Sequence, residues 1–222
     1  MIDISDFKVP GTDVWKNKLD IRDARQLASA EADFSAIRLA ELNVRPSIGA
    51  FTTEHLQRIH SHVFQDVYEW AGKLREVNMP ERLTRPGAPV WEIEKALDRV
   101  FDKLSSENHL KGYDLDEWTD RSAYYLGELA KIQPFLAGNE LVLREFTTEL
   151  GRENDIWLQW DGITKEQLTD ELSSVFQASR AANMRRLIML AVDPEPLKHP
   201  HSRGFISKPE HHRSRELDFT QD

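Results

Sequence analysis

The residues with the clearest chemical potential lie in one stretch, 133–144, between two segments with helical periodicity. Pro134 disfavours helical backbone at the residue before it, so the preceding helix is predicted to end near Ile132. Gly138 can adopt a positive φ angle, and Asn139 is a residue type that caps helix N-termini. A loop that turns into a helix start leaves backbone N–H groups unpaired. Such a point is a candidate anion-binding site.

Charged and polar side chains in this stretch limit what the site can do. Glu140 lies in the first helical turn, where the helix dipole favours a carboxylate and where a phosphate would also bind. Glu140 and Arg144 are four residues apart and can pair on one helix face. Gln133 carries an amide, which orients groups but has no basic nitrogen. Glu140 is therefore either an acid that occupies the anion site or an ordinary helix-end residue whose pairing contributes roughly a few tenths of a kcal/mol.

The stretch resembles the signature loop of the Fic (Fido-domain) family, H-P-F-x-[DE]-G-N-G-R-x-x-R-x-F. Active members of that family use this loop to transfer AMP from ATP to a protein hydroxyl. The chain matches the motif at Pro134, Phe135, Gly138, Asn139, Arg144 and Phe146. Residues 60–75, which contain Asp-Val-Tyr-Glu-Trp-Ala-Gly, and residues 123–129 also resemble the family. The similarity covers roughly residues 9–192, in family order.

Four positions depart from the family motif. Gln133 stands where the family has its general-base histidine, and Ala137 stands where the acidic Mg²⁺ ligand would be. Glu140 and Leu141 replace the second glycine and the first arginine of the phosphate cradle. Loss of a positioned general base typically costs about 10² to 10⁴ in rate. Ala137 also has no side-chain lone pair for a metal.

The resemblance and its departures together predict a Fic-like protein that is impaired in AMPylation and acts as a binding or regulatory pseudoenzyme. ATP and Mg²⁺, the expected cofactors of active relatives, are disfavoured, and no metal site is predicted. The candidate catalytic positions are Gln133 and Glu140, and the candidate cofactor-binding positions are Gly138, Asn139 and Arg144. Two alternatives stay open. One is an enzyme of altered chemistry with Glu140 as acid or base. The other is residual nucleotidyl transfer to protein hydroxyls.

Residual transfer would need a substitute base, and His60 and His62 are the candidates. Both lie on a helix predicted to start at Thr52 or Thr53. A histidine beside a buried apolar stripe is more often a hydrogen-bonded packing residue than a catalytic one. We therefore favour the packing interpretation for both.

The elements that would position the loop are helical, so the fold class is predicted to be all-α, a Fic-like helical bundle with a short β-hairpin flap. The first helix, 21–42, is predicted to bury Leu27, Ala30, Phe34 and Ile37, which recur at three- and four-residue spacing. Further helices are predicted over 52–72, 90–106, 115–132, 140–149, 164–178 and 183–192. The flap is predicted over 75–91, where Pro80, Pro86, Gly87 and Pro89 interrupt the chain. Arg82 and Arg85 would make it a cationic mouth, or it is a plain solvated loop.

Composition and charge set the remaining expectations. The 222 residues carry a net charge of −9 and contain no cysteine, which argues against nucleic-acid binding and excludes disulfides. An irregular lead-in is predicted over 1–20, the Fic-like domain over 21–192, and an extended charged tail over 193–222. No secretory signal and no apolar run of about 18 residues is present, so we expect no membrane span and a cytoplasmic protein. Export by a signal-independent secretion system stays open. The partners expected from the resemblance are a protein partner or target at the flap and a small antitoxin-like protein.

Overall fold

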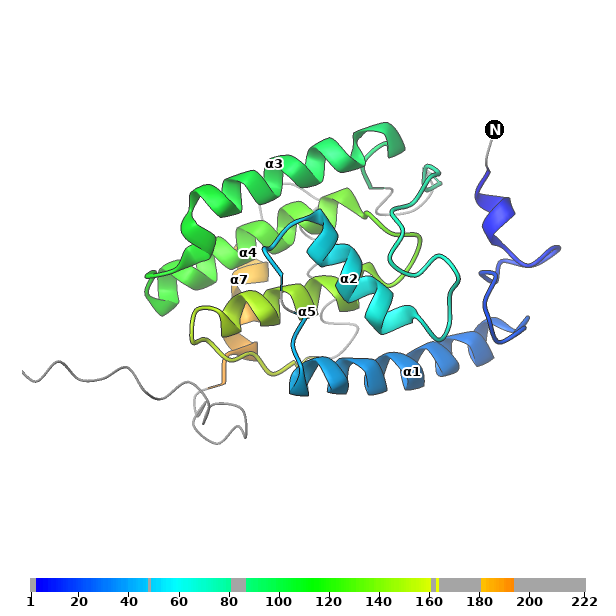
Figure 1. The fold of residues 1–222 in the computed structure, drawn as a ribbon, viewed down its shortest axis with the longest axis horizontal. Helices are drawn as coiled ribbons and strands as arrows, with labels where there is room; N and C mark the ends of the chain where they lie inside the picture. Colours follow the sequence, from blue (N-terminus) through cyan, green and yellow to red (C-terminus); the bar gives the residue numbers. More distant parts are fainter. Residues whose placement is uncertain (1–2, 48, 81–86, 161–162, 164–180, 194–222) are drawn as a thin grey trace, which may run out of the picture.

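The computed structural model describes residues 3–47, 49–80, 87–160, 163 and 181–193. Six α-helices occur in this part of the chain, and Figure 1 shows them packed into one bundle. They are α1 (Ala24–Val44), α2 (Thr53–Phe64), α3 (Ile93–Ser106), α4 (Leu115–Ile132), α5 (Asn139–Arg152) and α7 (Ala181–Ala191). Three short 3₁₀ helices join them, at Ile4–Phe7, Val90–Glu92 and Asn108–Leu110. The all-α prediction is confirmed.

The β-hairpin part of that prediction has no support in the residues that can be described. Residues 75–80 and 87–89, on either side of the predicted hairpin, contain no strand. Residues 81–86, with Arg82 and Arg85, lie outside the described residues, as do the predicted helix 164–178 and residues 194–222 of the predicted tail. The division into lead-in, domain and tail therefore stays a prediction.

Helix α4 lies at the centre of the bundle and packs against α3, α5 and α7 (Figure 1). It starts where the carboxylate of Asp114 accepts a hydrogen bond from the backbone N–H of Glu117 at 2.9 Å, which is an N-cap. Its inner face buries Trp118 and Tyr125 completely. Since the chain leaves this buried helix directly into the 133–138 loop, the core fixes one end of that loop. None of the helices described is long and apolar enough to cross a bilayer.

Helix α1 lies at the edge of the bundle and packs mainly on α2 (Figure 1). Its buried side chains are Leu27, Ser35 and Leu42. Of the predicted stripe, Leu27 is buried and Ala30 and Phe34 are half-buried. The prediction was wrong for Ile37, which is 58% exposed, as is Val44 near the helix end. The periodicity of the sequence correctly predicted a helix. However, the face of α1 that contacts the bundle is narrower than the part of its surface that carries apolar residues. An apolar side of α1 is left facing outward.

Candidate functional site

The 133–138 loop is held in shape by its own side chains and by the core. Helix α4 ends at Gln133, which has the left-handed angles φ 49° and ψ 63°. The amide of Asn139 clasps the loop: its oxygen accepts from the N–H of Phe135 at 3.0 Å, and its nitrogen donates to the carbonyl of Phe135 at 2.9 Å. Gly138 has φ 74°, and a Cβ atom there would lie 2.3 Å from the ring of Phe64. Only glycine fits that position.

The start of α5 differs from the sequence prediction in one respect. The N-cap residue is Gly138, not Asn139, because Asn139 is the first helical residue and its amide is committed to Phe135. No side chain forms a cap hydrogen bond at Gly138. The N-cap residue therefore provides no side-chain acceptor for the first N–H groups of α5. A helix-start anion site needs such N–H groups to be available to the anion.

His60 supports the loop from behind. Its Nδ1 accepts from the N–H of Gly72 at 2.8 Å, and its Nε2 lies 3.1 Å from the carbonyl of Ala137, to which it donates. The imidazole stacks on Phe135 with 4.0 Å between ring centroids, and burial lowers the pKa of His60 to about 4. Both nitrogens are engaged with backbone groups, which favours the packing interpretation over a catalytic one. His62 lies 3.1 Å from Glu41 instead.

A pH-dependent stability difference follows from this buried neutral histidine. The pKa of His60 is lower in the folded state than the ordinary value of 6.5, so its contribution is present above pH 6.5 and is lost as pH falls towards 4. We expect the stability advantage of the natural chain over His60→Gln to shrink by up to about 3 kcal/mol between pH 7.5 and 4. Urea unfolding of both proteins at several pH values measures this.

A second buried group, Glu145, gives the stability of the fold a pH dependence of the opposite sign. Comparing the natural chain with His60→Gln removes this contribution. Burial raises the pKa of Glu145 to about 7, so acidification from pH 7 towards 4.5 stabilises the fold through that carboxyl. Glu145 is present in both proteins, and its effect cancels in the difference. A stability difference that stayed constant across this pH range would contradict the assignment of His60 as a buried neutral group.

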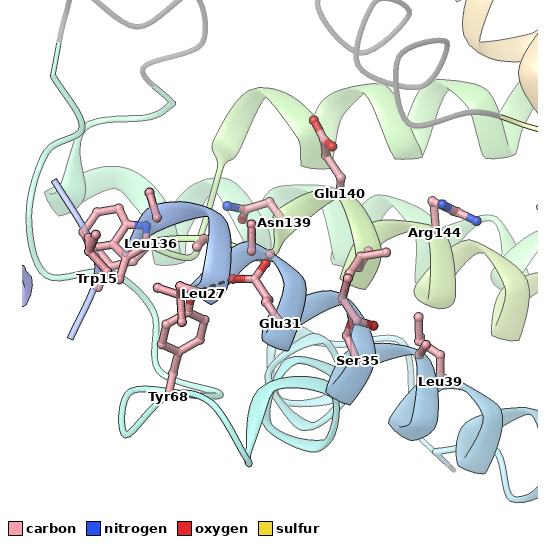
Figure 2. A pocket seen from close by; sticks show the side chains of 18 of the residues that line it. Trp15, Leu27, Glu31, Ser35, Leu39, Tyr68, Leu136, Asn139, Glu140 and Arg144 are labelled. Atoms are coloured by element: carbon pink, nitrogen blue, oxygen red, sulfur yellow. Dashed lines mark hydrogen bonds between the residues drawn. The ribbon is translucent and has the colours of Figure 1, made fainter. Parts of the chain in front are cut away.

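A groove of about 680 Å³ opens beside the loop. We call it the α1–α5 groove, because one wall is α1 and the other is the loop with the start of α5 (Figure 2). Its lining comprises Asp13, Val14, Trp15, Ala24, Leu27, Ala28, Glu31, Ala32, Ser35, Ala36, Leu39, Tyr68, Gln133, Leu136, Ala137, Gly138, Asn139, Glu140, Leu141 and Arg144. All five candidate site residues named from the sequence therefore border one groove, together with two of the departed positions, Ala137 and Leu141.

Glu140 and Arg144 both border the groove, but the pairing predicted between them is not seen. Among the salt bridges of the described residues there is none between these two side chains, and Figure 2 shows their charged groups pointing in different directions. The guanidinium of Arg144 lies 5.2 Å from the centroid of the Trp160 ring, a cation–π contact. The amide of Gln133 donates back to the carbonyl of Ala130 at 3.1 Å.

Two features of the site carried little sequence signal. The hydroxyl of Tyr68 donates to the carboxylate of Glu31 at 2.5 Å, which joins the D-V-Y-x-W-A-G segment to α1 across the groove. Arg75, at the end of that segment, is 2% exposed and donates to the carbonyl of Gln133 at 2.8 Å. Burial lowers the pKa of Arg75 to about 10. Tyr68 and Arg75 belong to the segment that resembles the family, but that resemblance did not predict which groups they contact.

The residues present do not fit the metal–triphosphate group used by active members of the resembling family. Ala137 offers no side-chain ligand, and its carbonyl accepts from His60. The described residues contain no group of three or more His, Asp or Glu side chains placed to hold a metal ion. Glu140 adds a negative charge beside the helix start, and Leu141 an apolar side chain. We therefore derive no step through such a group.

The chain forms a helical bundle in which a loop held by Asn139 leads into a helix start without a side-chain cap. Comparison with known proteins identifies the family in which this fold occurs. A model of the Fic/DOC family matches residues 50–150. The "Probable protein adenylyltransferase Fic" of Escherichia coli is 33% identical over 160 residues, covering 72% of this chain and 78% of that protein. The chain belongs to the Fic/DOC family.

Another relative is the "Protein adenylyltransferase VbhT" of Bartonella schoenbuchensis, which is 38% identical over 160 residues. The match covers 72% of this chain, and the chain spans only about a third (33%) of VbhT. Among solved structures, the BepC protein of Bartonella tribocorum with bound AMPPNP has a TM-score of 0.81 at 24% identity, covering 86% of this chain and 97% of that one. This last likeness is evidence for the fold alone.

Proposed function

We propose that this Fic-family chain is impaired in AMP transfer and binds a protein partner in the α1–α5 groove, as a pseudoenzyme with a binding or regulatory role. The observation that carries the proposal is the lining of the groove. None of the described residues in it is a histidine or a lysine, and Gln133 presents an amide where the family has its base. With an amide at position 133 and no acidic side chain at position 137, the groove keeps its shape but lacks the base and the metal ligand that the family's transfer step uses at these positions.

The partner proposed for the groove is a small antitoxin-like protein, and a second partner or target is proposed at the 75–91 segment. The support is geometric. One wall of the groove is an edge helix whose alanines Ala24, Ala28, Ala32 and Ala36 recur every fourth residue. Such a surface lets another helix approach closely. A cytoplasmic location is part of the proposal, as is export of the kind stated for the VirB-translocated BepC protein. Cell fractionation would test both.

An enzyme of altered chemistry is the second candidate, because Glu140 places a carboxylate in the groove at the start of α5. That carboxylate could act on another donor or on a small molecule as acid or base. If a turnover is found, Glu140→Gln decides the matter, because full turnover in that variant would remove Glu140 from the mechanism.

The direct test of the main proposal is titration calorimetry of the full chain with ATP and Mg²⁺. We expect no binding in the low micromolar range, since Glu140 and Leu141 replace phosphate-binding groups. Incubation with labelled ATP and a cell lysate should give no labelled protein bands. Low-micromolar binding together with labelled bands would overturn the proposal. A variant with the family motif restored at positions 133, 137, 140 and 141 is the positive control.

A further inference from the structure

Acidic side chains of the described residues line both walls of the α1–α5 groove, with Glu31 on α1 and Glu140 at the start of α5. Among the described residues that line it, Asp13, Glu31 and Glu140 carry carboxylates and Arg144 carries a guanidinium. Asp13 is compensated by Lys8, whose Nζ lies 2.6 Å from its carboxylate. Glu31 accepts a hydrogen bond from Tyr68 and forms no salt bridge with the described residues. We infer that the groove recognises a basic segment of the partner protein, with a lysine or arginine side chain at Glu31; this inference rests on the proposed binding function.

Glu31 is built to receive such a group. It lies on α1, faces the groove, is half-buried, and forms no salt bridge with the described residues. One of its oxygens accepts from the hydroxyl of Tyr68 at 2.5 Å (Figure 2). Tyr68 is itself fixed, because it is buried and stacks on Trp70 with 4.1 Å between ring centroids. The hydrogen bond orients the Glu31 carboxylate and leaves acceptor capacity for a charged donor.

The surroundings of Glu31 also suit a long cationic side chain. Figure 2 shows Leu27 and Tyr68 beside it and Trp15 further along the same groove, so apolar and aromatic side chains line this part of the groove. Such surroundings accept the methylene stem of lysine or arginine while the charged end meets the carboxylate. The chain already places one cation on this aromatic surface: Lys8 Nζ lies 5.5 Å from the centroid of the Trp15 ring.

The length of the groove indicates a segment of polypeptide as the occupant. Its α1 wall runs from Ala24 to Leu39, which is about 22 Å at 1.5 Å per residue. A small amine would fill only a fraction of that length. The same wall carries small apolar side chains at every fourth position, Ala24, Ala28, Ala32 and Ala36. A partner helix with an apolar stripe and a basic residue matches both features.

The test uses two fluorescent alanine- and leucine-rich helical peptides of equal length, one with three lysines and one with three glutamates at the same positions. Binding to the full chain at 150 mM salt is measured by anisotropy. We expect the lysine peptide to bind at least about tenfold more tightly than the glutamate peptide, and Glu31→Gln to weaken it by about five- to twentyfold. Glu140→Gln should weaken it in the same direction without touching the Tyr68 hydrogen bond.

The matched control is Glu94→Gln, on the exposed side of α3. It changes the net charge by the same amount as Glu31→Gln, so long-range attraction to a chain of net charge −9 cancels between them. Equal weakening by the two variants, or equal binding of the two peptides, would overturn the inference. So would n-butylammonium competing as strongly as the lysine peptide, because the site would then be one for small amines. Binding of ATP with Mg²⁺ is measured separately, so failure of the proposed function is recognised independently.

Discussion

The fourfold variant Gln133→His, Ala137→Asp, Glu140→Gly and Leu141→Arg is expected to bind ATP with Mg²⁺ and to transfer AMP to protein hydroxyls at least about 10²-fold faster than the natural chain. The reason is that the frame of the loop is already present. Asn139 clasps Phe135, and the backbone at Gln133 is left-handed, a conformation that histidine adopts more readily than most residues. Radiolabel transfer to a lysate, together with calorimetry, measures the gain.

The matched control for this gain is the threefold variant that keeps Gln133. It restores the carboxylate and the phosphate-binding groups but not the base, so it should bind ATP and transfer AMP about 10² to 10⁴ more slowly than the fourfold variant. A fourfold variant that bound ATP tightly and still transferred nothing would contradict the view that these positions account for the proposed impairment. Such a result would direct attention to the 75–91 segment and its target contacts.

The variant Arg75→Met is expected to lower the free energy of unfolding by about 3 kcal/mol or more. The guanidinium donates to four backbone carbonyls, those of Gln133 at 2.8 Å, Val77 at 2.9 Å, Ile132 at 3.3 Å, and Ala88. Two of these lie at the C-terminus of α4, where the helix dipole favours a cation. Methionine fills a similar volume but leaves all four acceptors without this donor in a buried place. Urea unfolding monitored by circular dichroism measures the loss.

The control for Arg75→Met is Arg99→Met, in a solvent-exposed pair with Glu92. Its effect should stay within about 1 kcal/mol, as for most exposed ion pairs. Hydrogen exchange of residues 132–137 adds a local readout. If Arg75 positions the loop, exchange there should rise more than in α3 under conditions where both proteins remain folded. A loss below 1 kcal/mol for Arg75→Met, with unchanged exchange in the loop, would contradict this role.

The sequence predicted the helices around the site well, because their signals are local. The pattern that ends α4 near Ile132 and starts the next helix close to Glu140 depends on a proline, a glycine and apolar spacing within about fifteen residues. Asn139 was wrongly predicted to be the N-cap residue. An asparagine side chain can cap a helix, but it can equally well form hydrogen bonds to the backbone of a loop. The clasp depends on where Phe135 lies after folding, which residue type does not reveal.

Side-chain contacts across the site were less predictable than the helices. The Glu140–Arg144 pair was expected from a spacing of four residues, which permits a contact but does not require it. In the folded protein the guanidinium of Arg144 lies beside Trp160 instead. Ile37 was placed in the core by the period of α1, although the bundle covers only part of that helix.

By itself the sequence determined which reactions the site residues can support, because residue type limits a side chain's chemistry. Gln133 has no basic nitrogen and Ala137 has no metal-binding oxygen in any fold. Only the tertiary structure decided what these residues face. It set Glu31 and the alanines of α1 opposite a loop about a hundred residues further along the chain, and it enclosed Arg75 among carbonyls. Contacts at such separations arise from how buried faces pack together, and no local pattern in the chain encodes them.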